Sequence, residues 1–339
     1  MIHEAREHRR ALAAWDTLAR DLPASTAQRA EGVTICSVAF RAKACLDLND
    51  RLMRRLNSDA AMLEWLLFDN NTDAREAMDP GDPRFRVVTP ASADGFVLGY
   101  EHALGIAALL ARVKTRFLLI LDPDCFIVRP EWVRDVPAHM DREGLGFFGT
   151  PINPRRHNSY RYFPYMVCMF VDLDRVALRD LCFVPDVWRL GANLAYSARK
   201  VLTRIPKAGY AFRWLLTEQY KTNGFRLKEQ FGDGRAVAFE CAQPVWDVDA
   251  EPRGGHIKRL LHTLTPDAVS PIPKKPGYCT PRGFASAGAP DVAAFGWEEF
   301  MWHDQPFAFH VGSAHAKGGD TRLLTDVINA FSGEMAGAN

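Results

Sequence analysis

Apolar runs of strand length alternate with helical patterns along the first part of the chain. The runs lie at residues 33–40, 63–68 and 117–121, and the stretch at 84–88 predicts a further short strand. Such runs are typical of strands buried inside a parallel sheet. Between them, residues 46–56 have leucines at fourfold spacing, which predicts an amphipathic helix, and residues 99–113 predict an almost entirely apolar one. Right-handed crossovers between these elements predict a doubly wound α/β fold, a mainly parallel sheet with helices on both faces.

The rest of the chain has weaker patterns. Residues 2–22 predict an N-terminal helix that ends at Pro23. After the central strand we expect helices at 131–140, following Asp174, and at 189–203, 295–302 and 321–331, and strands at 144–150, 165–171 and 307–311. Residues 265–290 are rich in Pro, Gly, Ser and Ala, which predicts a long loop or lid.

The composition sets limits on location and partners. The chain has 339 residues and a formal net charge of +1, so no broad basic footprint for nucleic acid is present. Its seven cysteines form no CxxC pair, and an odd count without a signal peptide predicts a cytoplasmic protein. No apolar run approaches the roughly 18 residues of a transmembrane helix, which leaves peripheral contact with a membrane open.

The strongest chemical signal follows the run at 117–121. Asp122 and Asp124 flank Pro123 directly after this strand, and ligands of open α/β sheets bind beyond the carboxyl ends of the strands. Two carboxylates at such a place suit Mg²⁺ or Mn²⁺ that bridges to phosphate oxygens. The pair therefore predicts a metal-dependent site for a nucleoside diphosphate sugar, with a structural, capping role as the alternative.

An ordered set of motifs resembles the glycosyltransferases of the A-type (GT-A) fold, specifically the family 2-like group. The set is TICSVAF, FDNNTD, the Gly-x-x-His-Ala element at 99–103 and the Asp-x-Asp triplet at 122–124. The resemblance covers about 33–207 and resumes near Phe307. It implies a Rossmann-like GT-A fold with an N-terminal helical appendage (1–31), a nucleotide-sugar-binding core (32–215) and an acceptor-side C-terminal region (216–339). The last region would include the lid at 265–290 and a returning metal-binding strand at 306–317.

The same resemblance implies the residues of a UDP- or GDP-sugar site. Asp124 would bind Mn²⁺ or Mg²⁺, Asp122 would contact ribose, a metal-bound water or the ion, and a late histidine, His310 or alternatively His315, would complete the metal site. For His310, a buried histidine satisfied by the backbone is the alternative. The nucleotide and its diphosphate would contact Val38, Ala39, Phe40, Asp69, Asn71, His102, Ser313 and Lys317. Asp-Asn-Asn is also good turn chemistry, so a plain turn at Asp69 remains the alternative.

An inverting transfer, which we expect here, also needs a general base. Asp186 is the first candidate because the family has an acid before a late helix, although usually as Glu-Asp. Asp172 and Asp174 compete with it, and each has a helix cap as its alternative role. A retaining enzyme would need no such base.

The acceptor is the least specified part of the reaction. The loop at 151–164 carries basic and aromatic residues that could stack on a sugar acceptor or bind an anionic one: Arg155, Arg156, His157, Tyr160, Arg161 and Tyr162. A nucleic-acid patch is the alternative, against which the balanced net charge argues. The Gln-x-x-Arg-Trp signature of processive members is absent, which favours the addition of a single sugar. The alternatives are a metal-dependent phosphohydrolase and a non-catalytic, nucleotide-binding relative of the transferases.

Overall fold

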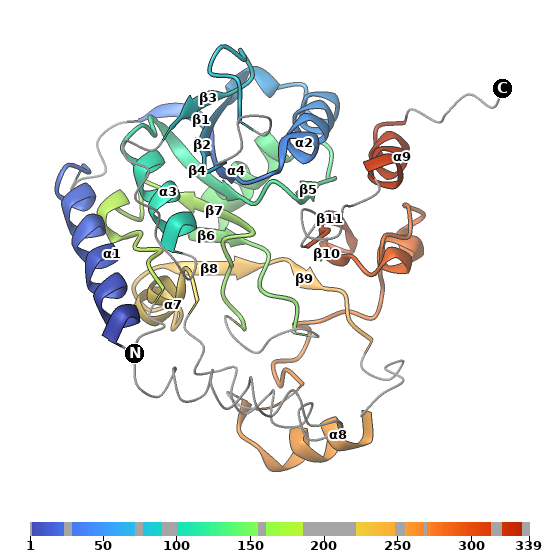
Figure 1. The fold of residues 1–339 in the computed structure, drawn as a ribbon. Helices are drawn as coiled ribbons and strands as arrows, with labels where there is room; N and C mark the ends of the chain where they lie inside the picture. The colour runs from blue at the N-terminus through green and yellow to red at the C-terminus, as the bar shows by residue number, and fades with distance from the viewer. Residues whose placement is uncertain are drawn as a thin grey trace.

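The computed structural model describes residues 2–23, 29–71, 77–89, 100–154, 161–185, 222–247, 255–267, 270, 272–312 and 321–333. Figure 1 shows two sheets in this part of the chain, with helices around them. Among the helices of the described residues, none combines the length and the apolar character that crossing a membrane requires.

The larger sheet has seven strands in the order β3-β2-β1-β4-β7-β6-β8. In chain order these are β1 (Ala30–Ala39), β2 (Leu63–Asp69), β3 (Arg86–Val88), β4 (Thr115–Leu121), β6 (Leu145–Gly149), β7 (Cys168–Asp172) and β8 (Ala238–Cys241). Neighbouring strands are parallel except that β7 runs antiparallel to both β4 and β6. The predicted α/β class with a mainly parallel sheet is therefore confirmed.

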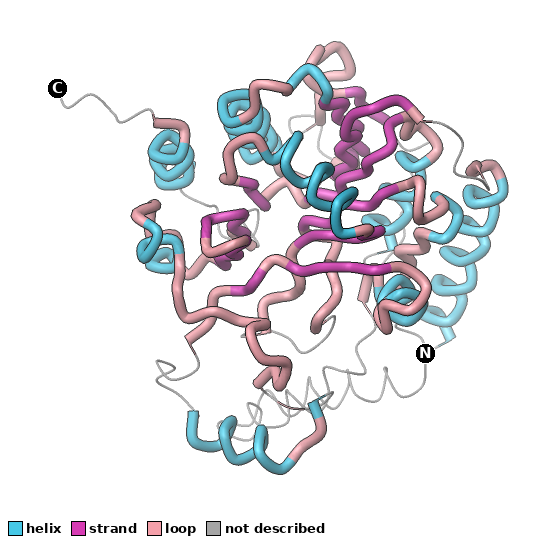
Figure 2. The backbone as a smooth tube through the Cα atoms, turned by 180° about the vertical axis from the view of Figure 1, so that it is seen from behind, coloured by secondary structure: helices cyan, strands magenta, loops and turns pink. Residues whose placement is uncertain are grey.

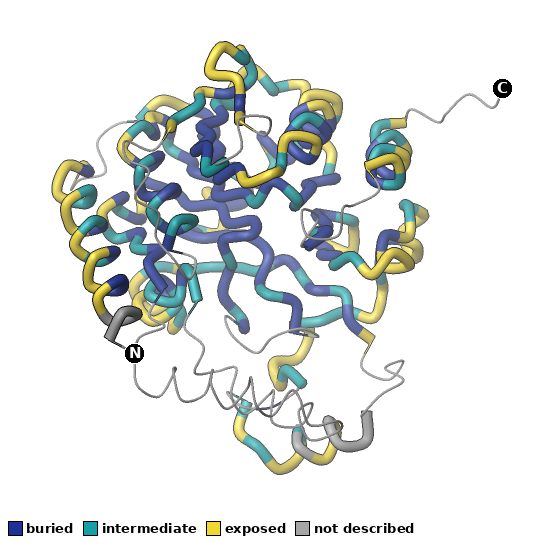
Figure 3. Tube along the Cα trace, in the orientation of Figure 1, coloured by how far each residue is buried: buried dark blue, intermediate teal, exposed yellow. Residues whose placement is uncertain are grey.

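Side chains of the central strands alternate between two cores, one on each face of this sheet. On β4, Leu118 and Ile120 enter the core shared with α1 (Ile2–Arg20) and α3 (Tyr100–Leu110). Phe117 and Leu119 enter the opposite core, which contains residues of α2 (Lys43–Leu56) and α4 (Trp132–Glu143). The strand thus has the buried pattern expected of a doubly covered sheet, and Figure 3 shows the buried strands inside a more exposed helical layer.

The smaller sheet is antiparallel, with strand order β5-β11-β10-β9. Its strands are β5 (Cys125–Ile127), β9 (Gln243–Pro244), β10 (Glu298–Trp302) and β11 (Gln305–His310). Three residues separate the end of β4 from the start of β5, so the chain passes from the larger sheet into the smaller one across Asp122, Pro123 and Asp124 (Figures 1 and 2). The acid pair therefore lies at the junction of the two sheets.

Two helix predictions are wrong. Residues 298–302 form β10 instead of a helix, because Phe300 and Trp302 enter one core while Met301 enters another, a period of two. After Asp174 the chain forms a turn and the short 3-10 helix η2 (Leu178–Asp180). The C-terminal helix α9 (Thr321–Phe331) has the predicted bounds, and the helix predicted at 189–203 lies outside the described residues.

Several elements were not predicted. These are the helices α7 (Phe225–Phe231) and α8 (Gly255–Leu264), the strands β8 and β9, and the 3-10 helices η1 (Ala60–Met62), η4 (Phe284–Ala287) and η5 (Ala293–Phe295). β8 lies beyond residue 215 in sequence but pairs with β6 in the larger sheet. The division into regions 1–31, 32–215 and 216–339 stays a prediction.

Candidate metal and nucleotide site

The acid pair follows the carboxyl end of β4. The Asp122 backbone N–H donates to the carbonyl of Val167 (2.9 Å), and the N–H of Cys125 donates to the carbonyl of Asp122 (2.9 Å), which closes a tight turn before β5. Because β1, β2 and β4 are parallel neighbours, Ala39, Asp69 and Asp122 all lie at the same edge of the larger sheet. This edge is where open α/β sheets bind ligands.

His310 reaches the acid pair through the smaller sheet. β11 pairs with β5 so that His310 lies opposite Cys125, and the N–H of Val311 donates to the carbonyl of Asp124 (3.0 Å). The His310 Nε2 atom is 3.4 Å from Oδ1 of Asp124. Residues separated by more than 180 positions in sequence are therefore joined by strand pairing, which holds the imidazole beside the carboxylate.

Asp122, Asp124 and His310 form a group that fits a divalent cation. One possible ligand atom from each residue lies within 4.8 Å of the other two. Two carboxylate oxygens and one imidazole nitrogen are acceptable to Mn²⁺, and Mg²⁺ favours the oxygens. An ion held by these three residues would keep coordination positions open for further oxygen ligands.

The protonation of this group is strongly affected by its surroundings. Burial raises the pKa of Asp122, His102 and His310 lower it, and the nearby charge of Asp124 raises it further. Burial alone would lower the pKa of His310, but its hydrogen bonds to Asp124 and Glu298 outweigh burial and raise this pKa to about 10. Without an ion, the imidazolium thus balances part of the carboxylate charge.

His102, on the first turn of α3, also lies beside the acid pair. Its Nε2 atom is 3.5 Å from Oδ1 of Asp122, and both side chains are partly exposed. The two acids therefore have one histidine beside each of them. His102 was expected to line the nucleotide pocket, and its position at the acid pair is compatible with that role.

Buried polar side chains behind the turn hold its backbone in place. Asn49 of α2 is fully buried, and its Nδ2 atom donates to the carbonyls of Pro123 (3.4 Å) and Cys125 (2.7 Å). The hydroxyl of Ser37 donates to the carbonyl of Leu121 (2.7 Å). Sequence reasoning missed Asn49, although a polar residue beside Leu48 and Leu52 on the apolar side of a predicted helix was an available signal.

The predicted nucleotide-binding residues of β1 and β2 lie at the same sheet edge. Val38 and Ala39 are buried at the end of β1, whereas Phe40 is 42% exposed. Asp69 is buried and holds a turn, since it accepts hydrogen bonds from the backbone N–H of Asn71 (3.0 Å) and from that of Met78 (2.9 Å). These are the contacts of the plain-turn alternative, and a contact of Asp69 or Asn71 with a nucleotide stays a prediction.

Asp172 and Asp174 lie at the wrong end of the sheet for a base near the acid pair. β7 runs antiparallel to β4 and pairs Asp172 with Phe117, four residues before Leu121, which is about 13 Å along a strand. Asp172 is fully buried and bound to Arg116 (2.9 Å), and the exposed carboxylate of Asp174 also pairs with Arg116 (3.0 Å). We therefore assign both acids to the scaffold.

Several predicted residues lie outside the part of the chain that the structure describes. They are the candidate base Asp186, the diphosphate contacts Ser313 and Lys317, the alternative ligand His315, and the loop residues Arg155, Arg156, His157 and Tyr160. Their roles stay predictions.

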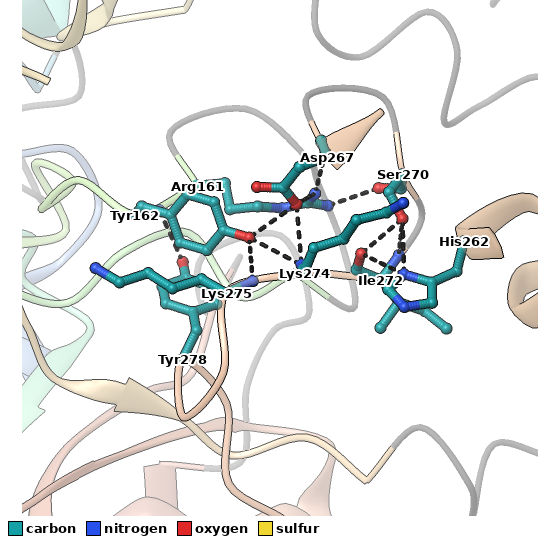
Figure 4. Close-up of polar contacts among 9 residues, drawn as sticks. All are labelled: Arg161, Tyr162, His262, Asp267, Ser270, Ile272, Lys274, Lys275 and Tyr278. Carbon is teal, nitrogen blue, oxygen red and sulfur yellow. Dashed lines mark hydrogen bonds and ion pairs between the residues drawn. The ribbon is translucent and has the colours of Figure 1, made fainter. Parts of the chain in front are cut away.

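Arg161 and Tyr162, which were expected to contact an acceptor, instead bind another part of the chain (Figure 4). Arg161 is buried and donates to the carbonyls of Asp267 (2.7 Å) and Ser270 (2.8 Å). The Tyr162 hydroxyl donates to Oδ1 of Asp267 (2.8 Å) and accepts from the N–H of Lys274 (3.0 Å). The two side chains thus anchor the segment predicted to be a lid.

Comparisons with known proteins gave matches only among solved structures. No family model matches the chain, and no curated protein matches it. One similar structure is the mannosyltransferase PcManGT from Pyrobaculum calidifontis in complex with GDP-Man and Mn²⁺, with 14% identity, a TM-score of 0.36, and coverage of 97% of this chain and 94% of that one.

Two further structures have the same level of similarity. TarS 1–349 from S. aureus in complex with UDP-GlcNAc is 9% identical, with a TM-score of 0.33 and coverage of 69% of this chain and 65% of TarS. The galactosyltransferase LgtC in complex with donor and acceptor sugar analogues is 12% identical, with a TM-score of 0.33 and coverage of 62% and 73%. These similarities are distant, and two of the three proteins are named as a mannosyltransferase and a galactosyltransferase.

Proposed function

We propose that the chain is a metal-dependent glycosyltransferase (EC 2.4) that transfers a single sugar from a UDP- or GDP-sugar to a small-molecule or glycan acceptor. The observation that carries this proposal is the meeting of Asp122, Asp124 and His310 at the carboxyl edge of a mainly parallel sheet. A carboxylate pair with an imidazole at this edge suits an ion that also binds phosphate oxygens.

The residues of the site have separate tasks in this proposal. Asp124 and His310 hold Mn²⁺ or Mg²⁺, and Asp122, next to His102, contacts either the ion or the donor's ribose. When bound, the cation supplies a positive charge that stabilises the departing nucleoside diphosphate. The exposed ring of Phe40 at the end of β1 offers a surface on which a nucleotide base can pack.

The proton of the acceptor hydroxyl needs a base if the anomeric configuration inverts. Asp186 remains our candidate, because Asp172 and Asp174 are bound to Arg116 at the far end of β4. A retaining reaction would make this base unnecessary, and product stereochemistry decides between the two courses.

A thermal-shift experiment with the whole chain tests the proposed function. We expect UDP or GDP to raise the unfolding midpoint more strongly with Mn²⁺ than without it, because a ligand that binds only the folded state stabilises it. Asp124→Ala and His310→Ala should abolish the metal-dependent part of the shift. Asp135→Ala is a matched control, since this acid on α4 pairs with its neighbour Arg134 and takes no part in the site.

An unchanged metal-dependent shift in Asp124→Ala would remove Asp124 from the metal site. Turnover then separates the remaining alternatives. Release of phosphate from simple esters, without nucleoside diphosphate from any nucleotide sugar, would replace the proposal with a phosphohydrolase. Binding of UDP or GDP without turnover on a broad panel of acceptors would leave a nucleotide-binding protein.

A further inference from the structure

His310 has a second carboxylate partner, which comes from the neighbouring strand. β10 and β11 are antiparallel and pair Glu298 directly with His310, so the two side chains project from the same face of the smaller sheet. Oε2 of Glu298 is 2.9 Å from Nδ1 of His310, while Nε2 on the other side of the ring is 3.4 Å from Asp124. The ring therefore lies between the two carboxylates.

The next residue along the strand is also a glutamate, but it faces the other way. Glu299 is 3% exposed, pairs across the strands with Phe309, and accepts a hydrogen bond from the N–H of Phe284 (3.2 Å). Glu298 therefore contacts a residue of the site, whereas Glu299 binds the backbone of Phe284. This pair supplies a matched control for any effect of Glu298.

We propose that Glu298 is a positioning residue for the ion that His310 would bind, an inference that rests on the proposed function. Binding of an ion would displace the proton of Nε2, and Glu298, by accepting the hydrogen of Nδ1, would keep the neutral ring oriented with its Nε2 lone pair toward Asp124. Second carboxylates of this kind orient metal-binding histidines and increase their basicity.

The strand pairing makes this arrangement rigid. β11 lies between β5 and β10, so the strand that carries His310 is hydrogen-bonded on both sides. Both side chains are largely buried, with exposed fractions of 11% for Glu298 and 15% for His310. Because the imidazole is already held in one orientation, it would lose little further conformational entropy when an ion binds.

The experiment measures binding of Mn²⁺ alone to the full chain, by titration followed through the paramagnetic resonance signal of the free ion. The matched variants are Glu298→Gln and Glu298→Met, which have similar length but differ in hydrogen bonding, because only the amide oxygen accepts well from Nδ1. We expect Glu298→Met to weaken Mn²⁺ binding about tenfold or more. Glu298→Gln should retain most of the affinity, and Glu299→Gln should bind Mn²⁺ as the unmodified chain does.

Equal Mn²⁺ affinity in Glu298→Met and the unmodified chain would overturn the positioning role. If Asp124→Ala still loses the ion in that case, the proposed function stands by itself. Absence of Mn²⁺ binding by the unmodified chain would overturn both proposals. Equal weakening in Glu298→Met and Glu299→Gln would show a general effect on the sheet and would also overturn the role. If Glu298→Met does not fold, Glu298→Ala replaces it.

Discussion

At the scale of single residues, the site depends on side chains that touch no substrate. Asn49 binds the two carbonyls that flank Asp124, and Glu298 binds the far nitrogen of His310. Each is a buried or largely buried polar group with a specific partner. In the low dielectric of a protein interior such a hydrogen bond is stabilising, and its loss is destabilising. The geometry of the acid pair is therefore a property of its supporting residues as much as of the acids themselves.

Glu299 gives a prediction for the pH dependence of stability. Burial raises its pKa, although hydrogen bonds from backbone N–H groups partly oppose this. A carboxyl group with a raised pKa in the folded state contributes stability below its unfolded pKa of about 4.3, and this contribution is lost as the pH rises through the folded value. Glu299→Gln, which cannot ionise, should therefore gain stability relative to the unmodified chain as the pH rises above about 4.3.

Urea unfolding of the two proteins at a series of pH values measures this difference. Glu298→Gln serves as the comparison for removing a glutamate charge from the same strand. If the free energies of unfolding of Glu299→Gln and of the unmodified chain changed in parallel with pH, the pKa of Glu299 would be the same in the folded and the unfolded state.

At the scale of elements, helix α3 lies unusually close to the larger sheet. A Cβ atom at Gly105 would be 2.9 Å from side-chain atoms of both Phe68 and Val38, shorter than real Cβ contacts. The glycine therefore lets the helix approach β1 and β2 directly. Since α3 also carries His102, this close packing sets how near His102 comes to Asp122.

Gly105→Ala should destabilise the fold. Alanine gains up to about 1 kcal/mol of helix propensity over glycine, but overpacking a tight core costs about 1–3 kcal/mol, so we expect a net loss of about 1 kcal/mol. Thermal unfolding measures it. A midpoint equal to or above that of the unmodified chain would mean that α3 moves away from the sheet without cost.

The features that residue patterns alone predicted were the local ones, whereas the long-range contact of His310 with the acid pair was implied by the family resemblance. The parallel strands were visible because continuous apolar runs require burial on both faces, and the acid pair was visible because it ends such a run. The register that pairs Glu298 with His310 could not be predicted, because EEFMW has a mixed pattern and its strand identity depends on neighbours far away in the chain. The burial of Arg161 likewise depends on partners about 106 positions later.

At the scale of the whole molecule, segments far apart in the sequence are joined by specific contacts. One of them is the contact of Arg161 and Tyr162 with 267–278, where Tyr162 has a positive φ of 68°. Such a backbone conformation is uncommon for a residue with a side chain. The hydroxyl of Tyr162 contacts Asp267, Lys274 and Lys275, so a single group binds the segment at two places.

Tyr162→Phe should loosen this segment while the sheets stay folded, because it removes one hydroxyl that makes three hydrogen bonds. We expect faster tryptic cleavage between Lys274 and Lys275, with an unfolding midpoint that changes little. Tyr278→Phe is the control, since its hydroxyl accepts a hydrogen bond from the N–H of Tyr162 and does not contact the lysines. Equal cleavage rates for Tyr162→Phe and the unmodified chain would show that other contacts hold the segment.

The junction between the sheets has a mechanical consequence. Asp124 directly precedes β5, which pairs with the strand that ends in His310, whereas Asp122 directly follows β4 of the larger sheet. A small tilt of one sheet against the other would therefore leave the spacing of Asp124 and His310 nearly constant and would change mainly the distance of each to Asp122. Asp124 and His310 would move together with the smaller sheet, so their distances to Asp122 would report the relative orientation of the two sheets.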